Sequence, residues 1–383
     1  MGTTPAFAFA AIVARRRELA RHHVSRSCVW RDQIWCRGTP PNARIADVIR
    51  YPALLQPGDK IAVTSPSSGV TGPGAERVAF CSNWLRGQGY ELVVGECMDG
   101  AGITSAPAEQ RAAELTAMLC DPEIRCVLPP WGGETAIDLV DLLDWEALAA
   151  AEPTWLVGYS DISTILLPIT TRLGWATLHG DNLADTPYRP PAGLLSWIDI
   201  ASQSGLHIQR DSGLIADWWR LDEDPNAIQW RKIGEGNWRL HGADSINVSG
   251  RLIGGCIESM ANLAGTPYGD VATFGQQHAS EGLVIYLEAA EDEAATICRN
   301  LHALRLAGWF EHAVAVLIGR TNAADNPKMT QDQAVLDALG RLELPIVFDV
   351  EIGHVPPHLP LVNGALATVV VNGDLHQITQ QLS

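Results

Sequence analysis

The segment that decides the fold is Trp155-Leu156-Val157-Gly158-Tyr159-Ser160-Asp161-Ile162. Its first four residues form a short apolar run typical of a buried strand, and residues 162–172 continue as an apolar helical pattern. A Gly-x-Ser turn between a buried strand and a helix is the geometry of a nucleophile elbow, which exposes the serine hydroxyl at the end of the strand. The final glycine of the hydrolase elbow is absent, so a plain helix cap by Ser160 and Asp161 is the alternative interpretation.

Strand, turn and helix follow one another in the same order before this segment. We expect strands at 60–64, 91–95, 126–128 and 155–158, and helices at 75–88, 108–120, 135–143 and 162–172. Such alternation indicates a mostly parallel sheet with helices on both faces. Functional groups in these sheets lie at the carboxyl ends of the strands. Those ends are expected at 65–68, 130–133 and 159–161.

The alternation lapses in residues 185–249, which hold three early prolines and five tryptophans. We interpret this segment as a long Trp-rich insertion or interdomain connection, and long ordered loops are often functional. A second α/β unit is expected from Gly250, with helices at 257–264 and 293–307 and strands at 283–287, 313–318 and 367–371. The sequence thus predicts four parts, which are an extension at 1–50, a nucleophile domain at 51–184, the insertion at 185–249 and a C-terminal domain at 250–376.

The composition excludes several classes of function. The 383 residues are 46% hydrophobic and 19% charged, with 27 Lys and Arg against 44 Asp and Glu and a net charge of −17. Nucleic-acid binding relies on clustered cations, so we expect no nucleic-acid partner. No apolar run approaches the roughly 18 residues of a membrane span, so no membrane partner is expected either.

Residues 1–50 and the cysteines bear on the cellular compartment. Residues 1–50 hold nine Arg against three acidic residues, and we expect a disordered or non-native extension, with an organelle transit peptide as the alternative. The eight cysteines show no metal-binding spacing. Several lie in apolar runs, so we expect reduced thiols in the core of a cytoplasmic protein.

A nucleophilic serine needs a base, and the base needs a group that orients it. His354, on a loop between Gly353 and two prolines, and His179, after a strand, are the candidate bases. Glu288 ends the apolar strand at 283–287 and is the candidate acid. Three other carboxylates compete with it, namely Glu258, Glu291 and Asp292. For each of these residues the alternative is a structural histidine or a solvated carboxylate.

These segments together resemble the LD-carboxypeptidase family of serine peptidases. The resemblance covers residues 51–372 and rests on Lys60–Ser68, Trp131-Gly132-Gly133, Gly158–Asp161, Gly254-Gly255, Gly265–Tyr268, Leu287-Glu288 and Gly353-His354. It implies a flavodoxin-like N-terminal domain and a smaller C-terminal α/β domain with a swivelling β core, usually in a homodimer. It also implies a triad of Ser160, Glu288 and His354, an oxyanion hole from the N–H groups of Gly133 and Asp161, and no metal or cofactor.

The family contains enzymes that trim bacterial wall peptides and microcin C immunity proteins that cleave aminoacyl-nucleotides. The Trp-rich insertion resembles the second group, because an aromatic ring can stack on a nucleobase. Residues expected at the substrate are Trp131, Gly132, Asp181, Trp218 and Trp219. The chain departs from common family patterns at Trp131, Asp181 and Cys256. The resemblance therefore favours an amidase acting on an aminoacyl- or peptidyl-nucleotide, with a murein LD-carboxypeptidase or a non-catalytic binder of nucleotide analogues as alternatives.

Overall fold

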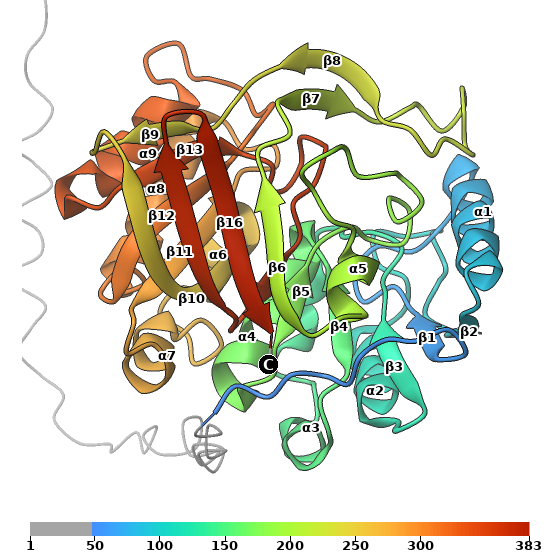
Figure 1. Cartoon of the computed structure of the whole chain (residues 1–383). Helices are drawn as coiled ribbons and strands as arrows, with labels where there is room; N and C mark the ends of the chain where they lie inside the picture. Colours follow the sequence, from blue (N-terminus) through green and yellow to red (C-terminus); the bar gives the residue numbers. More distant parts are fainter. Residues whose placement is uncertain (1–47, 383) are drawn as a thin grey trace, which may run out of the picture. The chain divides into compact units, whose positions relative to one another are not determined.

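Two large β-sheets and one two-stranded sheet organise residues 48–382, the part of the chain that the computed structural model describes (Figure 1). The first sheet has the strand order β14-β5-β4-β3-β1-β2. Its members are β1 (Lys60–Val63), β2 (Glu91–Val94), β3 (Ile124–Val127), β4 (Trp155–Gly158), β5 (Thr177–His179) and β14 (Leu361–Asn363). Strands β1 to β5 are parallel, and their order 2-1-3-4-5 is that of flavodoxin-like folds.

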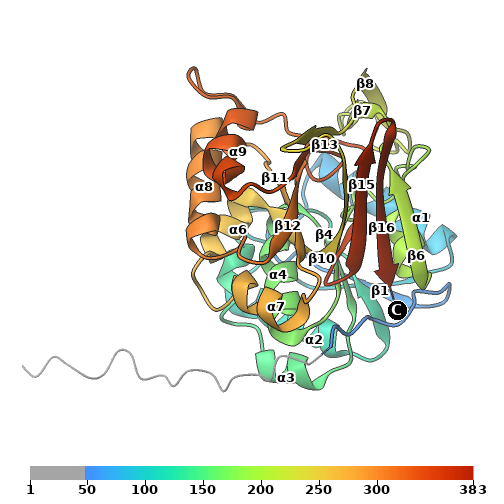
Figure 2. The same cartoon turned by 60° about the vertical axis from the view of Figure 1, so that its left-hand side comes forward.

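The second sheet has the order β6-β16-β15-β10-β11-β12-β13-β9. Its members are β6 (Gly205–Arg210), β9 (Arg239–His241), β10 (Ile246–Cys256), β11 (Leu283–Glu288), β12 (Ala313–Gly319), β13 (Ile346–Val350), β15 (Leu366–Asn372) and β16 (Leu375–Leu382). The four central strands, β10 to β13, are parallel, and the outer pairs are antiparallel. Helices α6 (Ile257–Leu263), α8 (Ala294–Leu306) and α9 (Gln331–Leu339) lie on one side of this sheet (Figure 2). The predicted α/β class with two units is confirmed.

The remaining helices match the predicted pattern in part. They are α1 (Pro73–Gly87), α2 (Ala108–Cys120), α3 (Trp145–Ala150), α4 (Ser163–Leu173), α5 (Trp197–Ala201) and α7 (Val271–His278), with short 3₁₀ turns η1 (Ala136–Leu139), η2 (Ser160–Ile162) and η3 (Gly340–Leu342). Those that begin at residues 73, 108 and 163 were predicted, and those that begin at residues 145, 197 and 271 were not. The helix predicted at 135–143 is wrong, because only η1 forms there. The Thr135 and Ala136 N–H groups donate instead to the side chains of Ser67 and Asp161, at 3.0 and 2.8 Å.

The Trp-rich segment 185–249 contains several β-strands and is not the single long loop that its sequence suggests. Strands β6 and β9 form the two edges of the second sheet, and β7 (Leu214–Asp217) and β8 (Arg231–Glu235) form a separate hairpin, drawn above that sheet in Figure 1. The polar composition of this segment suits edge strands, where one side of the backbone faces solvent.

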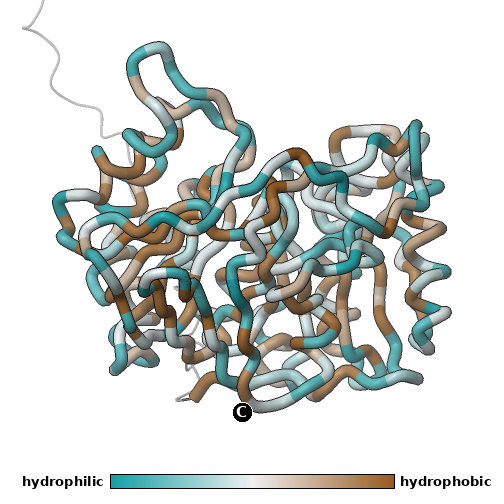
Figure 3. Tube along the Cα trace, turned by 45° about the horizontal axis from the view of Figure 1, so that its top comes forward, coloured by the Kyte–Doolittle hydropathy of each residue, from teal (hydrophilic) through white to brown (hydrophobic). Residues whose placement is uncertain are grey.

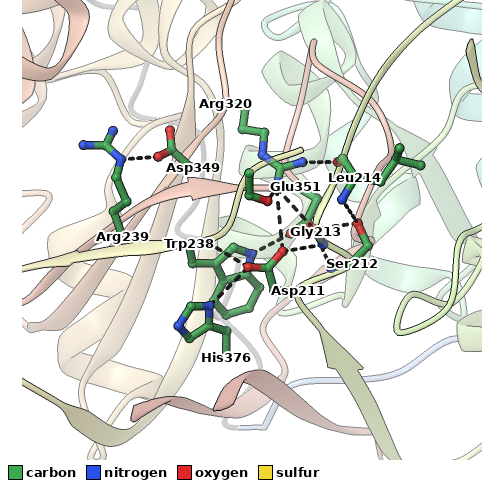
Figure 4. A network of polar contacts seen from close by, with 11 residues as sticks. Asp211, Ser212, Gly213, Leu214, Trp238, Arg239, Arg320, Asp349, Glu351 and His376 are labelled. Carbon is green, nitrogen blue, oxygen red and sulfur yellow. Dashed lines mark hydrogen bonds and ion pairs between the residues drawn. The ribbon is translucent and has the colours of Figure 1, made fainter. Parts of the chain in front are cut away.

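A buried polar network anchors the Trp-rich segment to the second sheet (Figure 4). The Arg320 guanidinium donates to the carbonyls of Leu214 and Gly236, at 2.6 and 3.0 Å, and lies 3.5 Å from the Glu351 carboxylate. Glu351 is fully buried and also accepts hydrogen bonds from Ser212. One arginine therefore compensates a buried carboxylate and holds both ends of the β7–β8 hairpin.

We expect Arg320→Met to lower the free energy of unfolding by about 3–5 kcal/mol, because it leaves a buried carboxylate without its cation. Arg239→Met is the matched control. Arg239 also pairs with two carboxylates, but its side chain is 54% exposed, so its loss is expected to cost less than about 1 kcal/mol. Urea unfolding followed by tryptophan fluorescence measures both, and equal losses would contradict the role of Arg320.

The two sheets share one apolar core and a buried polar link. A continuous cluster of buried side chains includes Val157 of β4 and Leu287 of β11, and apolar stretches run through the interior of the trace in Figure 3. The link is Asn363 in β14, which pairs antiparallel with β5 of the first sheet. Its side chain donates to Thr177 in β5 at 3.2 Å and accepts from Tyr286 in β11 at 2.7 Å.

Some predictions concern residues outside this region or at its edge. Residues 1–47 of the predicted extension lie outside the described residues. Ile49 is buried, and the Arg50 N–H donates to the Gly174 carbonyl at 2.7 Å. Six cysteines in the described region are free, and all except Cys120 are buried. No helix between residues 48 and 382 is long and apolar enough to cross a membrane.

Candidate active site

Ser160 lies on a tight turn between β4 and the helical segment that begins with η2. Its φ of 62° is in the left-handed region, which L-residues other than Asn and Asp rarely adopt. Such strain at a strand-to-helix turn is typical of a nucleophile elbow. No side-chain cap by Ser160 forms at this turn. The local geometry therefore favours the elbow over the alternative of a plain helix cap.

His354 connects Ser160 to Glu288. Its Nε2 lies 3.0 Å from Ser160 Oγ, and its Nδ1 lies 2.8 Å from Glu288 Oε2. The serine comes from the first sheet, whereas Glu288 ends β11 and His354 follows β13 in the second sheet. These contacts have the order of nucleophile, base and orienting acid that acyl transfer requires.

Gly353 allows this close approach. Its φ is +87°, and a Cβ at this position would lie 2.2 Å from Glu288 Oε2. Any larger residue would displace the carboxylate from His354 or move the loop. The N–H of Ala216 in β7 also donates to the Pro356 carbonyl at 2.9 Å, so the Trp-rich segment supports the loop that carries His354.

The ionisation of the pair follows from burial and mutual attraction. Burial alone would raise the pKa of Glu288, but the facing His354 lowers it by more, so the net shift is downward. Burial alone would lower the pKa of His354, but the charge of Glu288 and their hydrogen bond raise it by more, so the net shift is upward. The pair therefore favours a charged carboxylate that stabilises a protonated imidazole.

The competing candidates do not join this contact chain. His179 is buried, and burial lowers its pKa to about 4. Its ring packs edge-on against Tyr159 and Tyr286 rather than against Ser160. Glu258 accepts the N–H groups of residues 290–292, so it shapes that loop and does not contact His354. Glu291 and Asp292 make no hydrogen bond to His354.

The two expected oxyanion donors lie on loops joined by side-chain hydrogen bonds. The buried Asp161 carboxylate accepts from Ser67 Oγ at 2.6 Å, from the Ala136 N–H at 2.8 Å and from Thr164. This fixes the Gly132–Gly133 loop against the turn at Ser160. A Cβ on Gly132 would lie 2.9 Å from Ser160 Oγ. The Asp161 N–H is in the first turn of η2, where N–H groups have no intrahelical acceptor.

A cavity of about 510 Å³ opens beside this centre. Ser160, His354, Gly133 and Asp161 line it on one side. Carboxylates, amides and hydroxyls from α6, from α8 and from the loop after β11 line the rest, including Glu258, Asn262, Asp292, Thr296 and Asn300. The centre is therefore accessible to a small polar substrate.

The other residues expected at the substrate do not line this cavity. Trp131 packs against α1, because a Cβ on Gly74 would lie 2.4 Å from its ring. Trp219 is 36% exposed, and its indole N–H donates to the Gln229 carbonyl in the same hairpin loop. Trp218 and Asp181 lie in a second cluster, where the Trp218 ring packs against His358 and the Asp181 carboxylate pairs with the same histidine.

That second cluster, here called the aromatic cluster, consists of Tyr159, Tyr188, Trp218, Trp230 and His358 with the carboxylates of Asp181 and Asp185. It lies next to the reactive centre, because the Tyr159 ring packs edge-on against the His354 ring with centroids 5.2 Å apart. His358 and Tyr159 were not predicted. Two features of the sequence could have pointed to them: His358 directly follows the two prolines after His354, and Tyr159 directly precedes the serine.

Two groups of side chains in the described region could hold a metal ion. Cys256, Glu288 and His354 offer ligand atoms within 4.8 Å of one another, as do Cys298, His302 and Asp337. In the first group both ring nitrogens of His354 already contact Ser160 and Glu288. The arrangement thus suits proton transfer better than metal binding. Cys256 adds a thiol beside Glu288, and burial raises its pKa well above the usual value.

Comparisons with known proteins agree with this architecture. The sequence matches the LD-carboxypeptidase N-terminal domain over residues 61–180 and the LD-carboxypeptidase C-terminal domain over residues 249–369. A protein of Streptomyces coelicolor named as a carboxypeptidase is 31% identical over 307 residues, which cover 79% of this chain and 87% of that protein. The microcin C7 self-immunity protein MccF of Escherichia coli is 24% identical over 86% of this chain and 97% of its own length.

Solved structures of MccF share the fold. Complexes with aspartyl sulfamoyl adenosine and with glutamyl sulfamoyl guanosine each superimpose with a TM-score of 0.73, at 23% and 22% identity. Each covers 87% of this chain and 98% of the solved chain. Because both halves of the family match in order along one chain, and a relative above 30% identity covers most of it, this protein belongs to the LD-carboxypeptidase family.

Proposed function

We propose that the protein is a serine-type amidase that hydrolyses the amide of an aminoacyl- or peptidyl-nucleotide of the microcin C kind. The observation that carries the proposal is the bridge made by His354, which contacts Ser160 at 3.0 Å and Glu288 at 2.8 Å. Family membership supports hydrolysis, and the solved MccF complexes with aminoacyl sulfamoyl nucleosides support this class of substrate.

The proposed reaction begins with attack of Ser160 Oγ on the amide carbonyl carbon. His354 Nε2 takes the hydroxyl proton, and its Nδ1–H donates to Glu288, which stabilises the imidazolium. The N–H groups of Gly133 and Asp161 stabilise the oxyanion, and loss of one such donor typically costs about 3–4 kcal/mol. His354 then protonates the leaving nitrogen, and water attacks the acyl-serine through the same base. No metal or cofactor is required.

The aromatic cluster, which contacts His354 through Tyr159, supports a nucleoside-binding role next to the cavity. It offers indole and phenol rings within one neighbourhood, and stacking of a base on such a ring contributes roughly 1–3 kcal/mol. Tyr188 and Trp230 already stack on each other, with centroids 4.0 Å apart and planes at 10°. We propose Trp218, which packs against both His358 and Trp230, as a contact for the nucleoside.

A paired mass-spectrometric assay tests the proposal. The protein is given an aminoacyl sulfamoyl adenosine and, separately, an L,D-linked muropeptide tetrapeptide. We expect release of the free amino acid from the nucleotide and no release of D-alanine from the tetrapeptide. D-alanine release alone would make the protein an LD-carboxypeptidase. Stoichiometric binding of the nucleotide without any product would identify a non-catalytic binding protein.

The family resemblance also leads us to propose a cytoplasmic homodimer. Six free cysteines in the described region support a reducing compartment, since disulfides persist mainly in oxidising ones. Light scattering on the purified protein tests the assembly, and a mass equal to a single chain would contradict it.

A further inference from the structure

Carboxylates from separate parts of the chain gather around the cavity beside Ser160. Glu134 follows β3, Glu258 lies in the first turn of α6, and Glu291 and Asp292 lie between β11 and α8. Among the described residues that line the cavity there is no Lys or Arg, and His354 is the one basic side chain. Within residues 48–382, the proposed base is thus the only basic side chain that lines this cavity.

Most of these charges have no partner within the protein. Glu258 is committed, because its Oε1 accepts three main-chain N–H groups at 2.9–3.2 Å. The carboxylates of Glu134, Glu291 and Asp292, by contrast, have no hydrogen-bond donor and no ion pair anywhere in residues 48–382. Three negative charges therefore border the cavity without compensation.

The pKa of Glu134 agrees with a cavity bordered by uncompensated negative charges. Burial raises its pKa, and the charges of Glu291, Asp161, Asp292 and Glu258 raise it further. The four charges that raise the pKa of this carboxyl are all carboxylates that line the cavity. A cleft lined by one sign of charge focuses its field on whatever occupies it.

We infer that the group held in this cavity is an aminoacyl group with a positively charged side chain, such as lysyl, in addition to its α-ammonium. The inference rests on the proposed function, in which the nucleoside lies beside the aromatic cluster and the aminoacyl group occupies the cavity. A cationic side chain supplies the missing counter-charge to Glu134, Glu291 and Asp292. An acidic aminoacyl group, or the free terminal carboxylate of a murein peptide, is negatively charged and is therefore repelled by the same three carboxylates.

Two isosteric pairs of aminoacyl sulfamoyl adenosines test the inference. Lysyl is compared with norleucyl, and glutamyl with glutaminyl, by amino-acid release at low salt. We expect kcat/KM to be about 10-fold higher for lysyl than for norleucyl, and about 10-fold lower for glutamyl than for glutaminyl. Both ratios should shrink at high ionic strength, because salt screens partly exposed charges. Ratios near one, or a preference for glutamyl, would overturn the inference.

Substitutions of the cavity carboxylates test whether these residues cause the preference for lysyl over norleucyl. We expect Asp292→Asn and Glu134→Gln each to reduce the lysyl-to-norleucyl ratio about 3-fold, whereas Glu109→Gln, an equal charge change on α2 outside the cavity, leaves it unchanged. If all three variants keep the wild-type ratio, the carboxylates of Glu134 and Asp292 do not determine the preference for a positively charged aminoacyl side chain. Failure of the proposed function is a separate result, because the wild type would then release no amino acid from any of the four compounds.

Discussion

Ser160→Ala is expected to lower kcat by about 10⁴-fold or more while the protein stays folded. The substitution removes the oxygen that lies 3.0 Å from His354 Nε2. Alanine meets the same backbone strain as serine at φ 62°, so the free energy of unfolding should change by less than about 1 kcal/mol. Amino-acid release and urea unfolding measure the two effects.

A matched control separates the nucleophile from a general effect of losing a hydroxyl. Ser280 lies after α7, and its hydroxyl contacts only the neighbouring Glu281 in the described structure. Ser280→Ala should therefore keep full activity. Substantial turnover by Ser160→Ala, with the fold intact, would remove Ser160 from the mechanism and return the turn to a structural role.

Glu288→Gln is expected to lower kcat by about 10³- to 10⁴-fold without disrupting the packing, because glutamine has nearly the same shape as glutamate. The amide carries no charge to stabilise the imidazolium and can leave His354 in the wrong tautomer. The pKa of His354 should fall, because its rise above the usual value of about 6.5 depends on the Glu288 carboxylate.

The pH profile provides a second readout of the same change. His354 acts as a base only when neutral, so kcat/KM of the wild type should rise with pH through a pKa above the usual histidine value. In Glu288→Gln this rise should move to lower pH, on a lower plateau. An unshifted profile would mean that another group sets it. Glu76→Gln, on an exposed turn of α1, is the control and should leave the profile unchanged.

The same pair links pH to stability. His354 has a raised pKa in the folded state, so its contribution is full below its unfolded pKa and is lost as pH rises through the folded one. Glu288 has a lowered pKa, so its contribution is present above its unfolded pKa and is lost as pH falls through the folded one. The pair therefore stabilises most in mildly acidic solution, where both groups are charged.

The sequence predicted the local elements well and the long-range arrangement in part. Short apolar runs followed by helical periodicity located β1 to β4 and the strands β11 and β12, because burial on both faces leaves a continuous apolar signal. The edge strands β6 and β9 were missed. Their residues are largely polar, and their pairing partners, β16 and β13, are far away in the sequence, so no local pattern marks them.

The proposed catalytic residues were predictable singly, but their surroundings were not. Glu288 ends a strand, and Ser160 and His354 follow strands, which is where functional groups of such sheets lie. Trp131 was expected at the substrate because it precedes two glycines, yet its ring packs on α1. The carboxylates around the cavity come from residues 134, 258 and 291–292. Only folding brings these segments together, and a single exposed acid has no distinctive signal in sequence.

The position of β14 has a consequence for folding of the protein during its synthesis. This strand is made after both Glu288 and His354, yet it completes the sheet that carries Ser160 and links that sheet to the second one through Asn363. When the half of the chain that carries Ser160 has been synthesised, His354 has not yet been made. At that stage β5 is an unpaired edge of the first sheet, and an unpaired edge strand can pair with other chains. Closure of this edge therefore waits for residues 361–363, which are made after both Glu288 and His354.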